Sequence, residues 1–384
     1  MNRFQIIIIS FILLTLMLFL ACASVEKTQA PVVSTPEKVV AAKDTLQQEW
    51  DKLVSEAKKE GKVIVIGAPS ARVRNDLIQS FTAKYNIDLE YIAASGPEAT
   101  AQIQTQRRAG LYILDVLLGA SAPGQNILKP AGALDPLEPT LILPEVMNKN
   151  NWWRGDLPWV DPDHFRLAFS IYVSDPLAIN TQMVKLDEIK SWSDLLNPKW
   201  KGKIVMDDPS QGGPGLKWFG VVGTRILDMD YMRQFAKQEP VLLRDARLAV
   251  EWVAHGKYPI GLSLQSPIVT EFQKVGTPLL QISPVEGDYI TSGFGTVAVV
   301  KESPHKNAAT LFLNWLLSKE GQLAWARSEL RQSARADIPI DYLDKIHIRQ
   351  PGIKYVSGDD EELLLEQLKQ ADLAREIFRP LLGR

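Results

Sequence analysis

The feature that most restricts the fold of this chain is a repeated order in which a short apolar run follows an amphipathic segment. Apolar side chains recur at helical spacing over residues 45–59, and a run rich in Val and Ile follows at 62–66. The order repeats with a predicted helix at 73–85 and a predicted strand at 89–92. Strands and helices that alternate in this way form a largely parallel sheet with helices on both faces. The sequence therefore predicts an α/β fold.

The alternation resumes after a loop-rich stretch at 131–165, in which Asp-Pro turn signals recur. Near the C-terminus, the leucines between Leu363 and Leu373 predict a further helix, and the acidic run Asp359–Glu362 suits its positive N-terminal end. With 384 residues the chain is long enough for two or three domains. The other predicted elements are a helix from Ser95 to Arg108, strands at 112–118, 167–173, 203–206, 258–263 and 296–300, and a helix from Asn307 to beyond Leu317.

The first 21 residues are typical of a secretory signal peptide. Arg3 supplies positive charge, Phe4–Leu20 is an almost uninterrupted apolar run, and Ala21 is a small residue at its end. The run approaches the length of about 20 residues that a membrane-spanning helix needs, so an uncleaved anchor is an alternative, as is simple secretion. Cys22 follows directly, is the single cysteine of the chain, and resembles the lipid-modified cysteine of a bacterial lipobox. The resemblance implies cleavage and lipidation at Cys22.

Residues 22–43 are polar, contain prolines and show no apolar periodicity. This composition predicts a flexible tether between the lipid and the folded part, although a tail without any use fits the same residues. The tether and anchor would hold the folded part at the extracytoplasmic face of the cell membrane, in the periplasm if the cell has an outer membrane.

Several classes of chemistry are disfavoured by what the sequence lacks. One cysteine forms neither an intrachain disulfide nor a cysteine-based zinc site. The four histidines are far apart, and neither a nucleophile elbow nor a phosphate-binding glycine loop is present. The formal net charge is -2 without a basic block, which argues against nucleic acid as a partner. We therefore predict no catalytic residue, no metal site and no cofactor.

Polar turns stand instead at the ends of predicted strands. In open α/β sheets a ligand binds beyond the carboxyl ends of the strands, where helix N-termini and hydroxyl groups suit an anion or a polar molecule. Arg72 adds a guanidinium that can bind a carboxylate or phosphate through two hydrogen bonds. Any one such turn is commonly a plain turn or cap, and Arg72 can equally be a solvated surface residue. The turn residues predicted to contact a ligand are Ser70, Arg72, Ser95, Gly96, Ser121, Ser210 and Gln211.

Resemblance to a known family comes from four stretches, at 49–63, 192–204, 285–287 and 305–322. The chain resembles the bacterial extracellular solute-binding proteins of the ferric-iron and related-substrate group, which are capture subunits of ABC-type importers. The second stretch, with the letters WSDLLNPKWKGKI, and the fourth are the most specific. The resemblance implies a periplasmic-binding-protein fold of type II, in which two α/β lobes enclose a ligand cleft.

The resemblance also implies where the lobes begin and end. Lobe 1 would hold 44–170 and 296–384, and lobe 2 would hold 171–295, with strands crossing between them near 168–179 and 291–297. Closure of the lobes by a hinge motion would then bury the ligand.

The aromatic residues near the first crossing divide into two groups. Tyr172 lies on the crossing strand itself and is therefore a candidate ligand contact. Trp152, Trp153 and Trp159 can line the mouth of the cleft, but core packing is the commoner role for such residues.

The sequence departs from the ferric-binding members at one place. Those members use an adjacent tyrosine pair after a strand of the second lobe, whereas the matching stretch here, 261–267, has no tyrosine. Neutral Gln and Ser side chains are poor ligands for iron(III), which prefers phenolate or carboxylate oxygens. We therefore expect a small polar, anionic solute, with Gln265 among its contacts. Ferric iron or an iron chelate is the alternative ligand.

The predicted function is capture of this solute by a monomer and its delivery to an ABC transporter permease, without catalysis. Two alternatives stay open on the same fold. One is a lipid-anchored enzyme, for which the sequence shows no set of nucleophile, base and metal ligands. The other is a sensor that passes the ligand state to a membrane partner.

Overall fold

The computed structural model describes residues 36–174 and 177–382, with side chains from Asp44 onward. The chain divides into two units, Met1–Gln48 and Glu49–Arg384, and helix α2 (Pro36–Glu60) runs from one into the other. The predicted signal peptide, Cys22 and residues 22–35 of the predicted tether lie outside the described residues. The tether prediction is wrong for residues 36–43, because they belong to helix α2. None of the helices in the described ranges combines the length and the hydropathy that a membrane span requires.

The first lobe is built on a six-stranded sheet, in the order β2-β1-β3-β13-β4 with β5 also paired to β13. Strands β1, β2 and β3 are parallel, and β13 is antiparallel to β3. The strands are β1 (Lys62–Gly67), β2 (Asp88–Ala93), β3 (Val116–Leu118), β4 (Leu134–Asp135), β5 (Arg166–Ala168) and β13 (Thr296–Val300). The helices of this lobe are α3 (Ala71–Tyr85), α4 (Gly96–Arg108), α5 (Ser121–Pro123), α6 (Pro144–Met147), α11 (Lys306–Leu317) and α12 (Lys319–Glu329).

Alternate residues of β1 explain why this sheet has helices on both faces. Val63 and Val65 join one core, which also contains side chains of α3, α11 and α12. Ile64 and Ile66 point the other way and join a second core with side chains of α4. A strand that is apolar at every position is buried on both sides, so the predicted helix-covered sheet is confirmed.

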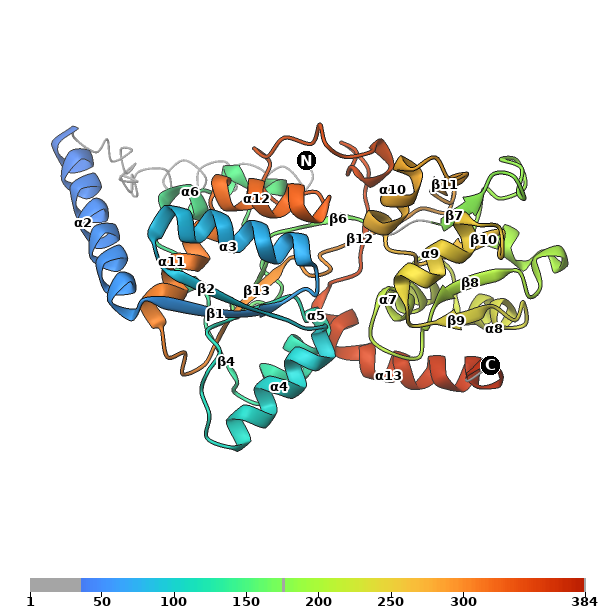
Figure 1. The fold of residues 1–384 in the computed structure, drawn as a ribbon, viewed down its shortest axis with the longest axis horizontal. Helices are drawn as coiled ribbons and strands as arrows, with labels where there is room; N and C mark the ends of the chain where they lie inside the picture. The colour runs from blue at the N-terminus through green and yellow to red at the C-terminus, as the bar shows by residue number, and fades with distance from the viewer. Residues whose placement is uncertain (1–35, 175–176, 383–384) are drawn as a thin grey trace, which may run out of the picture. The chain divides into compact units, whose positions relative to one another are not determined.

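The second lobe is built on a five-stranded sheet in the order β11-β7-β10-β8-β9, in which β8 is parallel to both neighbours and β7 is antiparallel to both of its own. Its strands are β7 (Leu177–Asn180), β8 (Ile204–Asp207), β9 (Val241–Leu243), β10 (Ile260–Leu262) and β11 (Leu279–Ile282). Its helices are α7 (Pro214–Val221), α8 (Met229–Ala236), α9 (Ala246–Ala254) and α10 (Ser266–Lys274). Figure 1 shows the two sheets as separate layers of the same unit.

A short third sheet joins the lobes. Strand β6 (Tyr172–Val173) is antiparallel to β12 (Tyr289–Thr291), and β14 (Val356–Ser357) adds to β12 in parallel. The two-lobed architecture with two crossing strands is thus as predicted, and β14 is an addition from the C-terminal part of the chain.

The C-terminal helix α13 (Glu361–Phe378) packs mainly against a different lobe from the one predicted. The sequence assigned residues 296–384 to the first lobe, but Leu363, Ala371 and Phe378 lie in the core of the second sheet, against α7. Leu364 alone joins a small cluster of the first lobe. The leucine stripe predicted the helix correctly, and the helix buries it mainly against the second lobe while bridging to the first.

Two predicted strands are shorter than the apolar runs that suggested them. In the run 112–118 only Val116–Leu118 pairs as β3, and Tyr112 and Ile113 remain exposed. The run 167–173 divides into β5 and β6, because the chain passes from the first sheet to the hinge sheet within it. The loop-rich stretch 131–165 carries, besides α6, three short 3-10 turns. The short helical turns of the described chain are η1 (Gly124–Leu128), η2 (Glu138–Thr140), η3 (Lys149–Asn151), η4 (Trp153–Gly155), η5 (Ser193–Leu196), η6 (Pro198–Trp200), η7 (Val222–Ile226), η8 (Lys345–His347) and η9 (Arg379–Leu381).

Candidate ligand cleft

Turns from the two lobes meet where the predicted strand ends face each other. The turn after β8 brings Gly212 so close to the start of α4 that a Cβ atom on Gly212 would lie 3.4 Å from Cγ of Pro97. Beside it, the hydroxyl of Ser121, after β3, lies 3.4 Å from the hydroxyl of Ser292, which follows hinge strand β12. Ser95–Pro97, Ser121 and the turn 209–213 thus line one side of the space between the lobes.

A buried arginine holds the Ser121 turn in position. Arg166 donates from Nη1 to the carbonyl oxygen of Ser121, and from Nη2 to the carbonyl of Gly119 (3.1 Å) and to the hydroxyl of Thr296 (2.8 Å). Burial lowers the pKa of Arg166 to about 10, with Asp359 and Asp161 acting in the opposite direction, so the guanidinium stays charged at neutral pH. The two terminal nitrogens of Arg166 thus join the turn after β3 to the start of β13.

A second buried charge lies under the hinge. Asp359 pairs with Lys217 of α7 at 2.5 Å and accepts hydrogen bonds from the backbone and the hydroxyl of Ser292. Lys217 also donates to the carbonyl of Gly358 (2.8 Å). Burial acts to raise the pKa of Asp359, but Lys217 and Ser292 together hold that pKa below its usual value. The pair ties the C-terminal segment to the second lobe and to the hinge.

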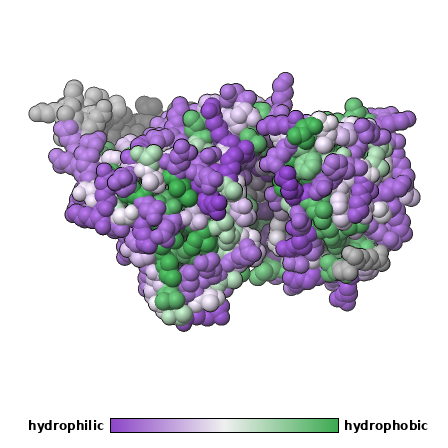
Figure 2. Space-filling view, in the orientation of Figure 1, coloured by the Kyte–Doolittle hydropathy of each residue, from purple (hydrophilic) through white to green (hydrophobic). Residues whose placement is uncertain are grey.

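On the other side, a pocket of about 280 Å³ lies between α10 and the chain that follows α12. Its walls come from the second lobe on one side and from residues 330–347 on the other. In Figure 1 this later segment runs beside α10, and Figure 2 shows a recess between the lobes on the same face. The lining residues are Ser266, Pro267, Thr270, Gln273, Lys274, Leu330, Tyr342, Leu343, Asp344 and His347.

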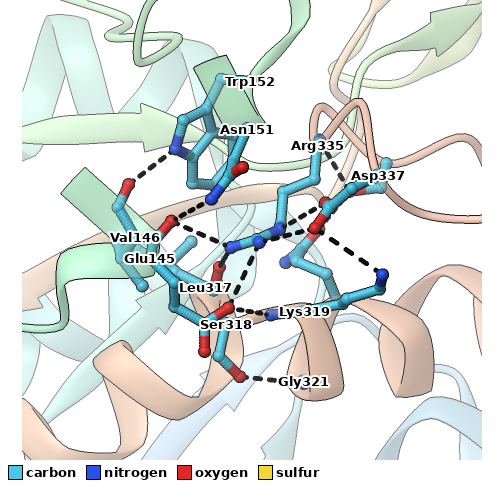
Figure 3. A network of polar contacts seen from close by, with 12 residues as sticks. Glu145, Val146, Asn151, Trp152, Leu317, Ser318, Lys319, Gly321, Arg335 and Asp337 are labelled. Atoms are coloured by element: carbon cyan, nitrogen blue, oxygen red, sulfur yellow. Dashed lines mark hydrogen bonds and ion pairs between the residues drawn. The ribbon is translucent and has the colours of Figure 1, made fainter. Parts of the chain in front are cut away.

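The segment after α12 is fixed to the first lobe by Arg335 (Figure 3). The Arg335 side chain is almost fully buried, bridges Asp337 (2.9 Å) and Glu145 (3.2 Å), and donates to the carbonyl of Leu317 (3.1 Å). Trp152 packs beside it and donates from its indole to the carbonyl of Val146 (2.7 Å). Trp152 therefore has the core role expected for it.

The residues predicted in the first lobe all lie at strand ends, several of them in structural hydrogen bonds. Ser70 caps α3, since its hydroxyl accepts from the backbone N–H of Val73 (3.3 Å). Arg72 is exposed and donates from Nε to the carbonyl of Ser328 in α12 (2.6 Å). Gly96 is required by a close approach, because a Cβ there would lie 3.2 Å from Cα of Ala120. Ser95 stands at the start of α4, with its backbone N–H bound to Glu98.

The helix start after β8 is filled by the protein's own carboxylates. Asp207 accepts from the backbone N–H of Gly215 at the start of α7 (2.8 Å). Asp208 accepts from the backbone of buried Ser210 (2.9 Å) and lies 3.4 Å from the side-chain nitrogen of exposed Gln211. An anion at this turn would meet two negative charges, so an anionic group is better accommodated on the Arg72 side of the cleft.

The two remaining predicted residues are not among the lining residues of the pocket beside α10. Gln265, the residue before α10, lines a much smaller cavity with Asp207 and Pro214. Tyr172 is buried on β6, with the guanidinium of Arg331 stacked 4.1 Å from the centre of its ring. Its hydroxyl fills the space over Gly293, where a Cβ atom would lie 2.2 Å from that oxygen.

Among the described residues no group of three or more His, Cys, Asp and Glu side chains could hold a metal ion. The matching stretch of the second lobe supplies Gln265 and Ser266 where ferric-binding proteins carry tyrosines.

Comparison with known families decides the identity of this two-lobed molecule. A family model described as bacterial extracellular solute-binding protein matches residues 76–338. The chain belongs to this family. A curated relative, an uncharacterised protein of Haemophilus influenzae, is 23% identical over 287 residues, which cover 72% of this chain and 79% of the relative.

Solved solute-binding proteins share the fold at low sequence identity. The periplasmic binding protein AfuA from Actinobacillus pleuropneumoniae, solved with fructose-6-phosphate bound, superposes with a TM-score of 0.68 at 18% identity, over 83% of this chain and 99% of AfuA. Iron-bound HitA from Pseudomonas aeruginosa gives 0.63 at 17% identity, over 84% and 99% of the chains. The substrate-binding protein of an ABC transporter from Agrobacterium tumefaciens gives 0.67 at 14%, over 83% and 94%. The predicted family and fold class are both confirmed.

Sequence reasoning missed the residues that arrive from the C-terminal part of the chain. The sequence analysis predicted for Asp359 only a favourable charge at a helix start, and it predicted no role in the ligand site for residues 342–347. Ser292 follows strand β12, and nothing in the sequence around it indicates that it contacts Ser121 or Asp359. One signal for the pocket wall was available. About sixty residues follow the last sequence stretch that resembles the family, at 305–322, and a segment of that length is expected to pack against the lobes.

Proposed function

We propose that this solute-binding protein captures a small polar solute with an anionic group in its interlobe cleft and hands it to an ABC-type permease. The observation that carries the proposal is the pocket of about 280 Å³, whose walls come from the second lobe and from the segment after α12. Pockets that bind small ligands lie in such clefts between domains and combine apolar walls with a few polar groups.

Arg72 supports the anionic part of the proposal. Its Nε bond to Ser328 anchors one edge of the guanidinium, and among the described residues no hydrogen bond is recorded for the two terminal nitrogens. These nitrogens form the fork that binds carboxylate or phosphate. Through Ser328, Arg72 is joined to the end of α12, and Leu330, two residues further along the chain, lines the pocket.

The experiment is calorimetry with the solute that co-purifies with the protein from its own cells, identified by native mass spectrometry. We expect Arg72→Ala to weaken binding by about 1.5–3 kcal/mol, the range for a hydrogen bond to a charged group. Arg74→Ala is the matched control, because Arg74 is two residues further along the same helix, and its effect should be much smaller. A cationic ligand, or an Arg72→Ala protein that binds like wild type, would refute the anionic assignment.

Iron or an iron chelate is the second candidate ligand. The bound iron of the structural neighbour HitA favours it, whereas the missing tyrosine pair weighs against it. Metal analysis of the protein purified from its own cells separates the two candidates.

The anchoring proposal concerns Cys22. A lipid on Cys22, joined to the folded part through residues 22–35 and helix α2, would keep a monomeric binding protein near its permease, on the extracytoplasmic side. Labelling with a fatty-acid analogue should mark wild type and not Cys22→Ser, and equal labelling would exclude the anchor. We propose binding without turnover, and an assay of the captured solute for chemical change tests this against the enzyme alternative. A pull-down with detergent-solubilised membranes, probed for permease and for sensor partners, tests the sensor alternative.

A further inference from the structure

The family-matched part of the chain ends at residue 338, and the residues after it form a C-terminal extension, 339–384. The described residues of the extension, 339–382, include β14 and α13. It also supplies Tyr342, Leu343, Asp344 and His347, which face α10 across the pocket. One wall of the cleft pocket therefore comes from a part of the chain that the family model does not include.

Hydrogen bonds hold this wall against both lobes. The Tyr342 hydroxyl donates to the carbonyl of Arg331 (3.0 Å), and burial raises the pKa of Tyr342 to about 12, which keeps it a donor at neutral pH. On the other side, Nε2 of His347 lies 3.1 Å from Oε1 of Gln281, a residue of β11. Gln281 donates in turn to the hydroxyl of Ser266, the first residue of α10 (2.9 Å).

The bonds from His347 to Ser266 form a short buried chain. With the Gln281 amide nitrogen donating to Ser266, the amide oxygen faces Nε2 of His347 and can accept a hydrogen bond from it. His347, Gln281 and Ser266 are 4%, 7% and 2% exposed, so water competes little with these bonds. Buried hydrogen bonds of this kind hold the wall in place against the second lobe.

The lining chemistry indicates what the pocket takes. Its two charged side chains other than histidine, Lys274 and Asp344, have opposite signs, so the pocket has no net preference for an ion. Hydroxyl groups of Ser266 and Thr270 and the amide of Gln273 offer both donors and acceptors, and Leu330, Leu343 and the Tyr342 ring offer apolar surface. The volume of about 280 Å³ is large enough for several waters or for a small solute.

We propose that the extension wall Tyr342–His347 determines the specificity of this protein, and that the pocket takes the uncharged, hydroxyl-bearing part of a solute whose anionic group binds at Arg72. The inference rests on the proposed function, because it names the class of solute captured in the same cleft. Carboxylate and hydroxyl side chains can distinguish a ligand that has a hydroxyl group from one that lacks it. The ligand without the hydroxyl leaves these side chains without a hydrogen-bond partner.

The test is isothermal titration calorimetry of the full-length protein with fructose 6-phosphate, fructose and inorganic phosphate. Wild type should bind fructose 6-phosphate at least tenfold more tightly than either of the other two. Thr270→Val and Asp344→Asn should each weaken fructose 6-phosphate binding at least tenfold and leave phosphate binding within threefold. Thr224→Val, on η7, and Asp372→Asn, on the exposed face of α13, are matched controls outside the pocket and should bind like wild type.

Failure of the inference and failure of the proposed function give different results. If wild type binds fructose 6-phosphate and the Thr270 and Asp344 variants bind it equally well, the wall has no role in specificity, while solute capture stands. If wild type binds none of the three probes, the hydroxyl-bearing class is overturned, and a different co-purified solute would still support capture. A third result is that the pocket variants weaken the binding of phosphate as much as the binding of fructose 6-phosphate. That result would overturn the proposal that the pocket and Arg72 bind different parts of the ligand.

Discussion

Substitution of Asp359 by asparagine tests the buried charge pair under the hinge. The side chains of Asp359 and Lys217 are 11% and 15% exposed, and their atoms lie 2.5 Å apart. Asparagine keeps the shape and one acceptor oxygen for Ser292 but removes the negative charge. Lys217 is then left as a buried cation whose one recorded neutral partner is the carbonyl of Gly358.

The expected loss of stability follows from this geometry. Breaking a fully buried ion pair from one side costs about 3–5 kcal/mol, because the remaining charge is desolvated without compensation. The slight exposure of Lys217 and its bond to Gly358 reduce that figure, so we expect Asp359→Asn to lower the free energy of unfolding by about 2–4 kcal/mol. Lys217→Met combined with Asp359→Asn should lose less than the sum of the two single changes, since neither charge is then left alone.

Urea unfolding followed by tryptophan fluorescence measures the effect, and Trp218 adjoins Lys217 in α7. Asp372→Asn is the control, because its pair with Arg375 in α13 is 75% and 54% exposed and should contribute within about 0.5 kcal/mol. The pH dependence has a defined sign. The folded-state pKa of Asp359 is lowered, so the contribution of the pair is present above about pH 4 and is lost as the pH falls through the folded pKa. Equal stability of Asp359→Asn and Asp372→Asn at pH 7 would refute the buried pair.

Three further outcomes are expected. Burial raises the pKa of Asp288 to about 6, so the folded protein loses stability as the pH rises through about 6 and this carboxyl group ionises. In urea unfolding, Asp288→Asn should therefore raise the free energy of unfolding by up to about 3 kcal/mol at pH 7.5 and leave it unchanged at pH 4. An effect that does not depend on pH would contradict this. Tyr172→Phe keeps the ring under Arg331 and removes the hydroxyl; we expect at least fivefold weaker binding of fructose 6-phosphate at an unchanged melting temperature, and unchanged affinity would remove that hydroxyl from the site. Small-angle scattering should give a smaller radius of gyration with saturating fructose 6-phosphate than without it, and an identical radius would argue against lobe closure.

The local elements were predictable because their signals are local. Four consecutive apolar residues of β1, Val63–Ile66, are buried, and such a run requires cover on both faces. The hydroxyl of Ser70 caps α3 within the same turn, which is also a local contact, although the sequence analysis assigned Ser70 to the ligand. In each case the residues that decide the structure are neighbours in the chain, so a single sequence contains the information.

The cleft was predictable only in part, because its decisive contacts join distant residues. Asp359 meets Ser292 across 67 positions and Lys217 across 142. An aspartate before a predicted helix has an adequate local explanation, and nothing in its neighbourhood signals an ion pair. Likewise, Arg72 could be recognised as a candidate fork, but its anchoring by Ser328 of α12 could not.

The C-terminal extension also bears on how the lobes can move. Asp359 and Lys217 both travel with the second lobe, since α13 shares the core of that lobe, and the ion pair therefore does not resist opening. The bonds that opening would break include two from η1 of the first lobe to α13, in which Gln125 binds Glu361 (2.7 Å) and Asn126 binds the carbonyl of Leu364 (3.1 Å). Each contributes about 0.5–1.5 kcal/mol. Together the two bonds favour this arrangement of the lobes by about 1–3 kcal/mol, a factor of roughly 5–150, before any solute binds. Less of the solute's binding energy is then needed for closure than in a hinge without these bonds.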